Sequence, residues 1–190
     1  KDTIPPEVEE FLERFKGNHI LVTIPDKKEG KPRHHQLKDI ADVHTRNEAQ
    51  CGVFFTVNDL DQSLDLDPDK HRTKKMLTHL RAMFADDDKP RDKPRTDWPT
   101  PPTITVRSST SKKGNKYHYY WLISAHLPAV NDSEEARLWV RMQKGLNRSF
   151  ATDESASQVN RVLRLPGFHH HKGEPCLVEV VGEVGATYSW

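Results

Sequence analysis

Cysteine is scarce in this chain of 190 residues, which contains only Cys51 and Cys176. Two widely separated cysteines without a C-x-x-C pair exclude a disulfide framework and the cysteine-rich zinc sites. Both lie in apolar runs, where a free thiol behaves as a small hydrophobic side chain. We therefore expect two buried free thiols and a reducing compartment, the cytoplasm.

Long apolar runs are also missing. The sequence has no stretch of 18 apolar residues and no recognisable signal peptide, so we expect no membrane span. Charged residues make up 30% of the chain, yet its shorter apolar runs are too well formed for a disordered polymer. The length suits one domain, and we expect a single domain over residues 1–190.

The chain also lacks an excess of charge of one sign, since it contains 29 Lys and Arg residues and 28 Asp and Glu residues. A nucleic-acid partner would therefore have to meet a local basic surface. Residues 27–35, 107–116 and 169–172 are the candidates, and each is also compatible with a solvated loop. The histidines at 169–171 lack the cysteines or the H-x-x-x-H spacing of a zinc site.

Helical and strand patterns interleave along the chain. Apolar spacing predicts helices over 5–15, 133–150 and 153–163, the last capped by Asp153. Residues 76–86 fit either a helix or a strand. Strands are expected over residues 19–25, 51–57, 103–109, 117–123 and 175–184, with 103–123 forming a hairpin. The pattern predicts an α+β fold with helices packed on a mixed sheet.

The segment MFADDDKP, residues 83–90, places three carboxylates side by side. Like charges this close repel one another. If the segment ends a strand, Asp86 and Asp88 point the same way, because alternate residues share a face. A divalent cation between them would relieve the repulsion, and carboxylate oxygens suit Mg²⁺ or Mn²⁺. A solvated acidic loop is the other interpretation.

The predicted hairpin brings further polar groups together. Ser108 and Ser109 end its first strand, and His118 lies on the returning strand. Hydroxyl and imidazole donors suit phosphate oxygens, although a half-buried structural histidine fits the pattern equally well. The returning strand also carries aromatic side chains that either form the core or stack on bases, namely Tyr117, Tyr119, Tyr120 and Trp121.

Taken in order, these segments resemble the RepB-type primase branch of the archaeo-eukaryotic primase superfamily. CGVFFTVN (51–58) is similar to the strand ahead of the first motif, and RAMFADDD (81–88) resembles motif I with its two metal-binding acids. SSTSKKGNKYHYYW (108–121) resembles motif II, in which a histidine meets the triphosphate. DESASQVNRVLRLPGFHHHK (153–172) resembles the region of the third acid and the Arg-x-Pro-Gly segment that follows it. The resemblance covers residues 51–172.

The resemblance implies a DNA primase or primase-polymerase with a catalytic core like the RNA-recognition fold. It implies template-directed nucleotidyl transfer on single-stranded DNA, with nucleoside triphosphates as substrates and two Mg²⁺ or Mn²⁺ ions as cofactors. Plasmid or phage replication and a replicative helicase partner would fit it.

Residue by residue, the resemblance implies that Asp86, Asp88 and Asp153 bind the metal ions, with Asp132 as the rival for the third position. It implies that His118 binds the triphosphate with help from Ser108 or Ser109. Contacts with nucleotide or template are implied for the tail of the region, at Arg164, His170, His171 and Lys172. Bracing of the loop is the alternative role of Arg164.

Two positions depart from the family pattern. Asp87 replaces a usually apolar residue, so it is either a surface acid or a member of the ligating pair. Lys116 replaces a serine that often stands two residues before the histidine.

Two other functions suit the same residues. One is a metal-dependent nuclease, because D-x-D with histidine also suits hydrolysis. The other is a non-catalytic nucleic-acid-binding module.

Overall fold

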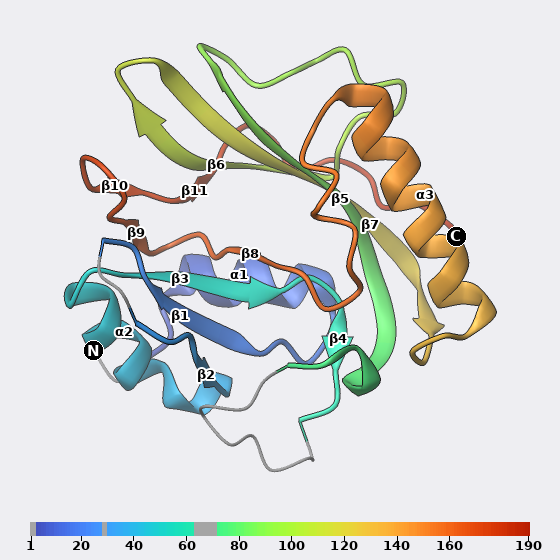
Figure 1. Cartoon of the computed structure of the whole chain (residues 1–190), viewed down its shortest axis with the longest axis horizontal. Coiled ribbons are helices and arrows are strands. Elements are labelled where there is room, and N and C mark those ends of the chain that lie inside the picture. The colour runs from blue at the N-terminus through green and yellow to red at the C-terminus, as the bar shows by residue number, and fades with distance from the viewer. Residues whose placement is uncertain (1–2, 28–29, 63–71) are drawn as a thin grey trace.

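A computed structural model describes residues 3–27, 30–62 and 72–190, and its strands form two main sheets (Figure 1). The first sheet has the order β2-β1-β3-β8 and the second has the order β11-β6-β7-β5-β4. The first contains β1 (Leu21–Pro25), β2 (Arg33–His35), β3 (Cys51–Thr56) and β8 (Val162–Arg164). The second contains β4 (Asp59–Leu60), β5 (Leu77–Arg91), β6 (Ile104–Ser111), β7 (Gly114–Pro128) and β11 (Glu179–Val180). A small third sheet pairs β9 (His169–His170) with β10 (Cys176–Leu177).

Within the described ranges, three α-helices pack on these sheets: α1 (Pro6–Phe15), α2 (Ile40–Glu48) and α3 (Glu134–Phe150). The apolar face of α1 joins the two sheets, because the ring of Phe11 lies 5.1 Å from that of Phe55 in β3 and 6.0 Å from that of Tyr120 in β7. Helix α3 lies along β5 at the side of the molecule (Figure 1). Two 3₁₀ turns complete the elements of the described chain, η1 (Leu37–Asp39) and η2 (Lys74–Met76).

The predicted α+β class is confirmed, with one difference in the arrangement of strands. The sequence suggested a single mixed sheet, whereas the pairs between named strands are antiparallel and are divided between separate sheets. The hydrophobic core therefore lies between two curved sheets, with α1 contributing to it from one side.

The segment 76–86, which fitted both patterns, lies almost wholly in strand β5. Leu80, Ala82 and Phe84 alternate toward the core, while β7 pairs along most of the strand. The hairpin of β6 and β7 is also as predicted. The four aromatic side chains of β7 between Tyr117 and Trp121 are buried, which supports their interpretation as core.

The helix predicted over residues 153–163 is wrong. The Asp153 carboxylate accepts a hydrogen bond from the Ser155 N–H at 2.9 Å, and the Ser157 hydroxyl donates to the Glu154 carbonyl at 2.8 Å. Such side-chain bonds to the local backbone favour turns over helix. Residues 162–164 instead pair with β3 as strand β8.

Smaller expectations also changed. The strand predicted over 175–184 is reduced to the two-residue strands β10 and β11. Cys51 is a buried free thiol as expected, whereas Cys176 is free but only partly buried. In the part of the chain that the structure describes, no helix is long and apolar enough to cross a membrane.

Candidate active site

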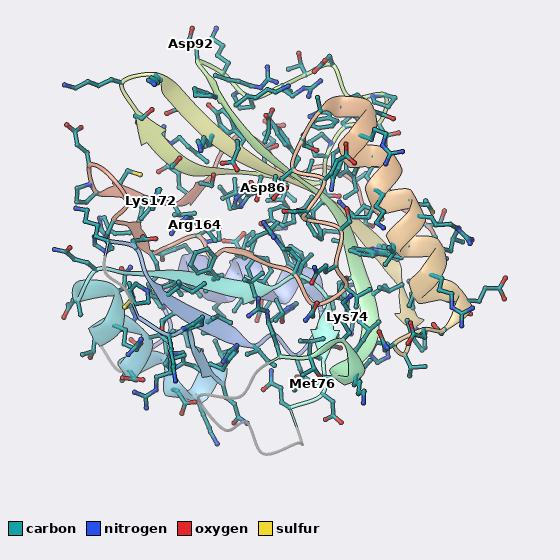
Figure 2. The ribbon with its side chains drawn as sticks, viewed as in Figure 1. Lys74, Met76, Asp86, Asp92, Arg164 and Lys172 are labelled. Carbon is teal, nitrogen blue, oxygen red and sulfur yellow. The ribbon has the colours of Figure 1, made fainter. Side chains whose placement is uncertain are left out.

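A pocket of about 170 Å³ is lined by residues from both main sheets. Figure 2 shows Asp86 in the space between the sheets, with Arg164 and Lys172 on the side of β8 and β9. The pocket brings together most of the residues singled out in the sequence, from segments far apart in the chain. Its polar lining consists of Asp86, Asp88, Ser108, Ser109, Lys116, His118, Arg161, Arg164, His170 and Lys172.

Asp86 and Asp88 reach this pocket because they share one face of β5. Asp86 stands opposite His118 of β7 in the strand register, and its Oδ1 lies 3.5 Å from His118 Nε2. The Asp86 side chain is only 14% exposed. Burial, and next the charges of Asp88 and Asp153, raise the pKa of Asp86 to about 6, partly offset by Arg161.

Asp153 is held beside Asp86 by the edge of β5. One edge of β5 pairs with β7. Its other edge pairs with β4 only at Leu77 and His79, and no strand of the described chain pairs with it beyond Leu80. The Trp139 Nε1–H donates to the Ala82 carbonyl at 3.0 Å, and the Gln143 side chain accepts from the Phe84 N–H at 3.1 Å.

Farther along this edge, the Asp86 carbonyl accepts from the Asp153 N–H at 3.0 Å. Groups from α3 and from the loop after it thus satisfy the exposed edge of the strand.

Each of the three carboxylates faces a cation. One guanidinium nitrogen of Arg161, Nη2, lies 3.0 Å from Asp153 Oδ2 and 3.4 Å from Asp86 Oδ2. The Nζ of Lys116 lies 2.7 Å from Asp88 Oδ1. These two side chains partly balance the negative charge that the three acids concentrate.

The structure separates Asp87 and Asp132 from this group. Asp87 points to the opposite face of β5, where it is 1% exposed and pairs with Arg91 at 2.7 Å, so it is not a surface acid. Asp132 is exposed just before α3, and Asp153 follows that helix. The 17 residues of α3 span about 25 Å, which puts Asp132 at the far end from Asp153.

A β-bulge brings both serines into the pocket. The register of β6 and β7 shifts between Arg107 and Ser109, so Ser108 is an extra residue and both hydroxyl-bearing side chains line the pocket. His118 is buried beside them, and its pKa is lowered to about 3 by burial and next by the charge of Arg164. The imidazole is therefore neutral at ordinary pH.

Arg164 braces the loop that follows β8. Its guanidinium donates to both carboxylate oxygens of Asp26, at 2.8 and 3.3 Å, and lies 4.7 Å from the ring centre of Phe54. Gly52 leaves room for it, because a Cβ there would collide with Arg164 Nη1. The His171 N–H also donates to Asp26, at 2.8 Å, so Asp26 anchors both ends of the loop.

The residues that follow this loop, His170, His171 and Lys172, differ in their positions relative to the pocket. His170 is buried in the pocket wall, and burial together with Arg164 lowers its pKa to about 4. Neither of its ring nitrogens has a hydrogen-bond partner in the described part of the protein. Lys172 is exposed at the pocket rim. The His171 side chain does not line the pocket.

Sequence reasoning missed two charged residues of the site. Asp26 lies 138 positions before its partner Arg164, and no local pattern links the two. Arg161 was assigned to a helix, whereas it follows a turn and faces two acids. The signal that could have found Arg161 is its position just before the Arg-x-Pro-Gly segment.

The carboxylates of the pocket fit divalent cations in their chemistry. Within the described residues no three His, Cys, Asp or Glu side chains are already arranged to hold a metal ion. Asp86 and Asp88 nevertheless present hard carboxylate oxygens on one face, and burial, followed by the charge of Asp88, raises the pKa of Asp86. These are the ligands and the excess of charge that Mg²⁺ or Mn²⁺ requires. The pair therefore fits such an ion, while Arg161 occupies the side of Asp86 that faces Asp153.

Comparisons with known proteins identify the family and the fold of the chain. The family model of the RepB DNA-primase N-terminal domain matches residues 69–183, more than half of the chain. A search of curated protein sequences finds no match.

Three solved structures are similar in fold. The AEP domain of the primase-polymerase (PrimPol) of cyanophage S-2L has a TM-score of 0.73 at 17% identity, over 100% of this chain and 95% of that one. Primase RepB′ has a TM-score of 0.59 at 14% identity, over 96% of this chain and 57% of that one. The catalytic domain of primase RepB′ in complex with initiator DNA has a TM-score of 0.59 at 15% identity, over 96% of this chain and 86% of that one. The resemblance and the primase-like fold inferred from the sequence are confirmed.

Proposed function

Since the chain belongs to the RepB DNA-primase N-terminal domain family and is a DNA primase, we propose that it makes primers by template-directed nucleotidyl transfer in the pocket between its two sheets. One observation carries this proposal. A pocket that contains two adjacent carboxylates also contains a neutral buried histidine, two serines and several cations. This combination suits a nucleoside triphosphate held against a reacting hydroxyl group.

In this proposal Asp86 and Asp88 hold two Mg²⁺ or Mn²⁺ ions, with Asp153 as the third carboxylate. When bound, such ions lower the pKa of an attacking 3′-hydroxyl and neutralise charge on the triphosphate. Asp153 is favoured over Asp132 because its backbone is bonded to that of Asp86. Arg161, which links the two acids, is a further member of the site.

The triphosphate is proposed to lie beside the acids, on the side of the pocket formed by β6 and β7. His118 is neutral and can donate one hydrogen bond, and the hydroxyls of Ser108 and Ser109 add further donors. Lys172 at the rim would attract phosphate oxygens, with His170 as a second contact. The His171 side chain is the weakest candidate, because it lies outside the pocket lining.

The proposed template is single-stranded DNA. One of the similar structures was solved in complex with initiator DNA, which supports a DNA template for this chain. Nucleoside triphosphates as substrates, plasmid or phage replication and a replicative helicase partner rest on the family resemblance.

The test compares the wild-type protein with an Asp86→Asn, Asp88→Asn double variant and with the exposed-acid control Asp92→Asn. With single-stranded DNA, nucleoside triphosphates and Mg²⁺ or Mn²⁺, wild type and control should release pyrophosphate. The double variant should release it about 100-fold or more slowly, as expected when charged groups are removed from a reacting centre. Its melting temperature and DNA binding should remain close to wild type. Release of nucleoside monophosphate by the wild type would instead identify a nuclease.

A further inference from the structure

Helix α3 carries a basic stripe that the proposed reaction does not use. Its buried face consists of Ala136, Trp139, Gln143 and Asn147. Next to that face lie Arg137, Arg141 and Lys144, which are exposed and spaced so that they share one side of the helix. Within the described residues none of these three cations forms an ion pair. A charged stripe alone is commonly a solvated helix face, so the residues around it determine whether it forms a binding site.

The stripe forms one wall of a groove of about 570 Å³. Lys74, just before β5, brings a fourth cation to the groove from a different element. In the described part of the lining the acids are Asp132 and Glu154, and Glu154 already lies 3.4 Å from Arg148 outside the groove. Among the described residues of the lining, four cations therefore face two acids, in a protein whose formal net charge is only +1.

The other wall is the loop between α3 and β8, which also borders the candidate active site. Glu154, Ser155, Ser157, Gln158 and Val159 line the groove. The same loop contains Asp153 and ends at Arg161, which lines the catalytic pocket. Figure 1 shows this loop running between α3 and the rest of the molecule, and Figure 2 places Lys74 near one end of β5 and Asp86 toward the other. A single loop thus separates the groove from the pocket.

We propose that this groove binds the sugar-phosphate backbone of the single-stranded DNA template beside the catalytic pocket. The inference rests on the proposed function, which supplies such a strand to the neighbouring pocket. Unpaired cations attract phosphates, and the amide and hydroxyl side chains of the lining suit contacts to phosphate and sugar oxygens. Among the described residues no aromatic side chain lines the groove, so the grip is on the backbone and is independent of base sequence.

The test variant is Arg141→Gln, Lys144→Gln, which removes two charges and keeps good helix formers on α3. Its matched control is Lys16→Gln, Lys38→Gln, which removes two exposed charges from the N-terminal part of the chain. Binding of fluorescent oligothymidylate, one short and one long, is measured over a series of salt concentrations. In addition, nucleotide-dependent pyrophosphate release is measured on the short template.

The proposal predicts weaker binding of the long strand by the test variant, roughly five- to tenfold at low salt. The slope of log affinity against log salt should become shallower by about 1.4, because each phosphate that a cation neutralises on a single strand adds about 0.7 to it. The control should keep both the wild-type slope and the wild-type rate of pyrophosphate release on the short template. An unchanged slope in the test variant, or an equal change in the control, would overturn the proposal. Wild-type binding without pyrophosphate release would contradict the proposed function alone.

Discussion

At the scale of single residues, Asp86 has the most constrained environment in the site. It is buried, it stands beside a second carboxylate, and Arg161 contacts its side chain from the direction of Asp153. Burial and like charges raise its pKa, while Arg161 lowers it. Its value of about 6 is therefore a balance that one substitution can shift.

Replacing Arg161 with glutamine is expected to raise the pKa of Asp86 above about 6, because the guanidinium that favours the ionised carboxylate is removed. The measurement is an NMR titration of the aspartate carboxyl carbons in metal-free protein. Arg164→Gln is the matched control, since Arg164 faces the same pocket but is bonded to Asp26. An Asp86 pKa that stays the same or falls in the Arg161 variant would contradict this electrostatic account.

The sequence could predict some of these neighbours but not others. Strand alternation alone places Asp86 and Asp88 on one face, and the hairpin pattern brings Ser108 and His118 near one another. The pairs of Arg161 with Asp153 and of Arg164 with Asp26 depend on how a loop and two sheets pack. No periodicity in the chain encodes that packing, so tertiary contacts of this kind were missed.

At the scale of elements, the position of the site depends on how α3 covers the edge of β5. The Gln143 side chain accepts from the Phe84 N–H and donates to the Phe84 carbonyl, so it replaces a neighbouring strand at that point. It is fully buried. Leu substitution removes both bonds and leaves two backbone groups of β5 without partners.

We expect Gln143→Leu to lower the free energy of unfolding by about 2–4 kcal/mol, because each buried unsatisfied group costs about 1–3 kcal/mol and the added apolar surface offsets part of this. Chemical denaturation measures the change. The adjacent exposed residue provides the control, and Met142→Leu should alter stability by no more than about 0.5 kcal/mol. A Gln143 variant as stable as the wild type would show that the edge needs no such cover.

The helix predicted over 153–163 failed for reasons that belong to this scale. Its apolar spacing was real, since Ala156, Val159, Val162 and Leu163 are all buried. The local pattern could not show that the Asp153 N–H is bonded to β5 or that Val162 and Leu163 pair with β3. In contrast, α1 and the long α3 have complete amphipathic patterns, and the sequence predicted both of them correctly.

At the scale of the whole molecule, four buried histidines among the described residues make stability depend on pH. Burial is the first cause in each case, and their pKa values are lowered to about 4 for His19, His35 and His170 and to about 3 for His118. In the unfolded chain a histidine binds a proton near pH 6.5, so the unfolded state gains protons first as pH falls. The stability these groups contribute is present above about pH 6.5 and is lost toward pH 4.

The free energy of unfolding at about pH 4.5 should therefore be lower than at about pH 7.5, by a total on the order of several kcal/mol. Asp86 acts in the opposite direction, because its raised pKa favours the folded state as pH falls through about 6. An Asp86→Asn variant should accordingly lose stability more steeply on acidification. Denaturant titrations at the two pH values provide the measurement, and equal or higher stability at the lower pH would refute the prediction.

The overall architecture was predictable only as a class. Interleaved helix and strand patterns indicated α+β, but the division of strands between two sheets depends on which strands pair. That pairing places β8, which begins one residue after Arg161, opposite the second sheet and so creates the pocket. The pocket, and hence the proposed site, is a property of the packed molecule.

The central claim is that this pocket starts nucleic-acid chains on a template. The most direct measurement is synthesis on single-stranded DNA with labelled nucleoside triphosphates and Mg²⁺ or Mn²⁺, in the absence of any primer. We predict labelled oligomers whose composition follows the template sequence. A wild-type protein that binds the template yet forms no oligomer would contradict the claim.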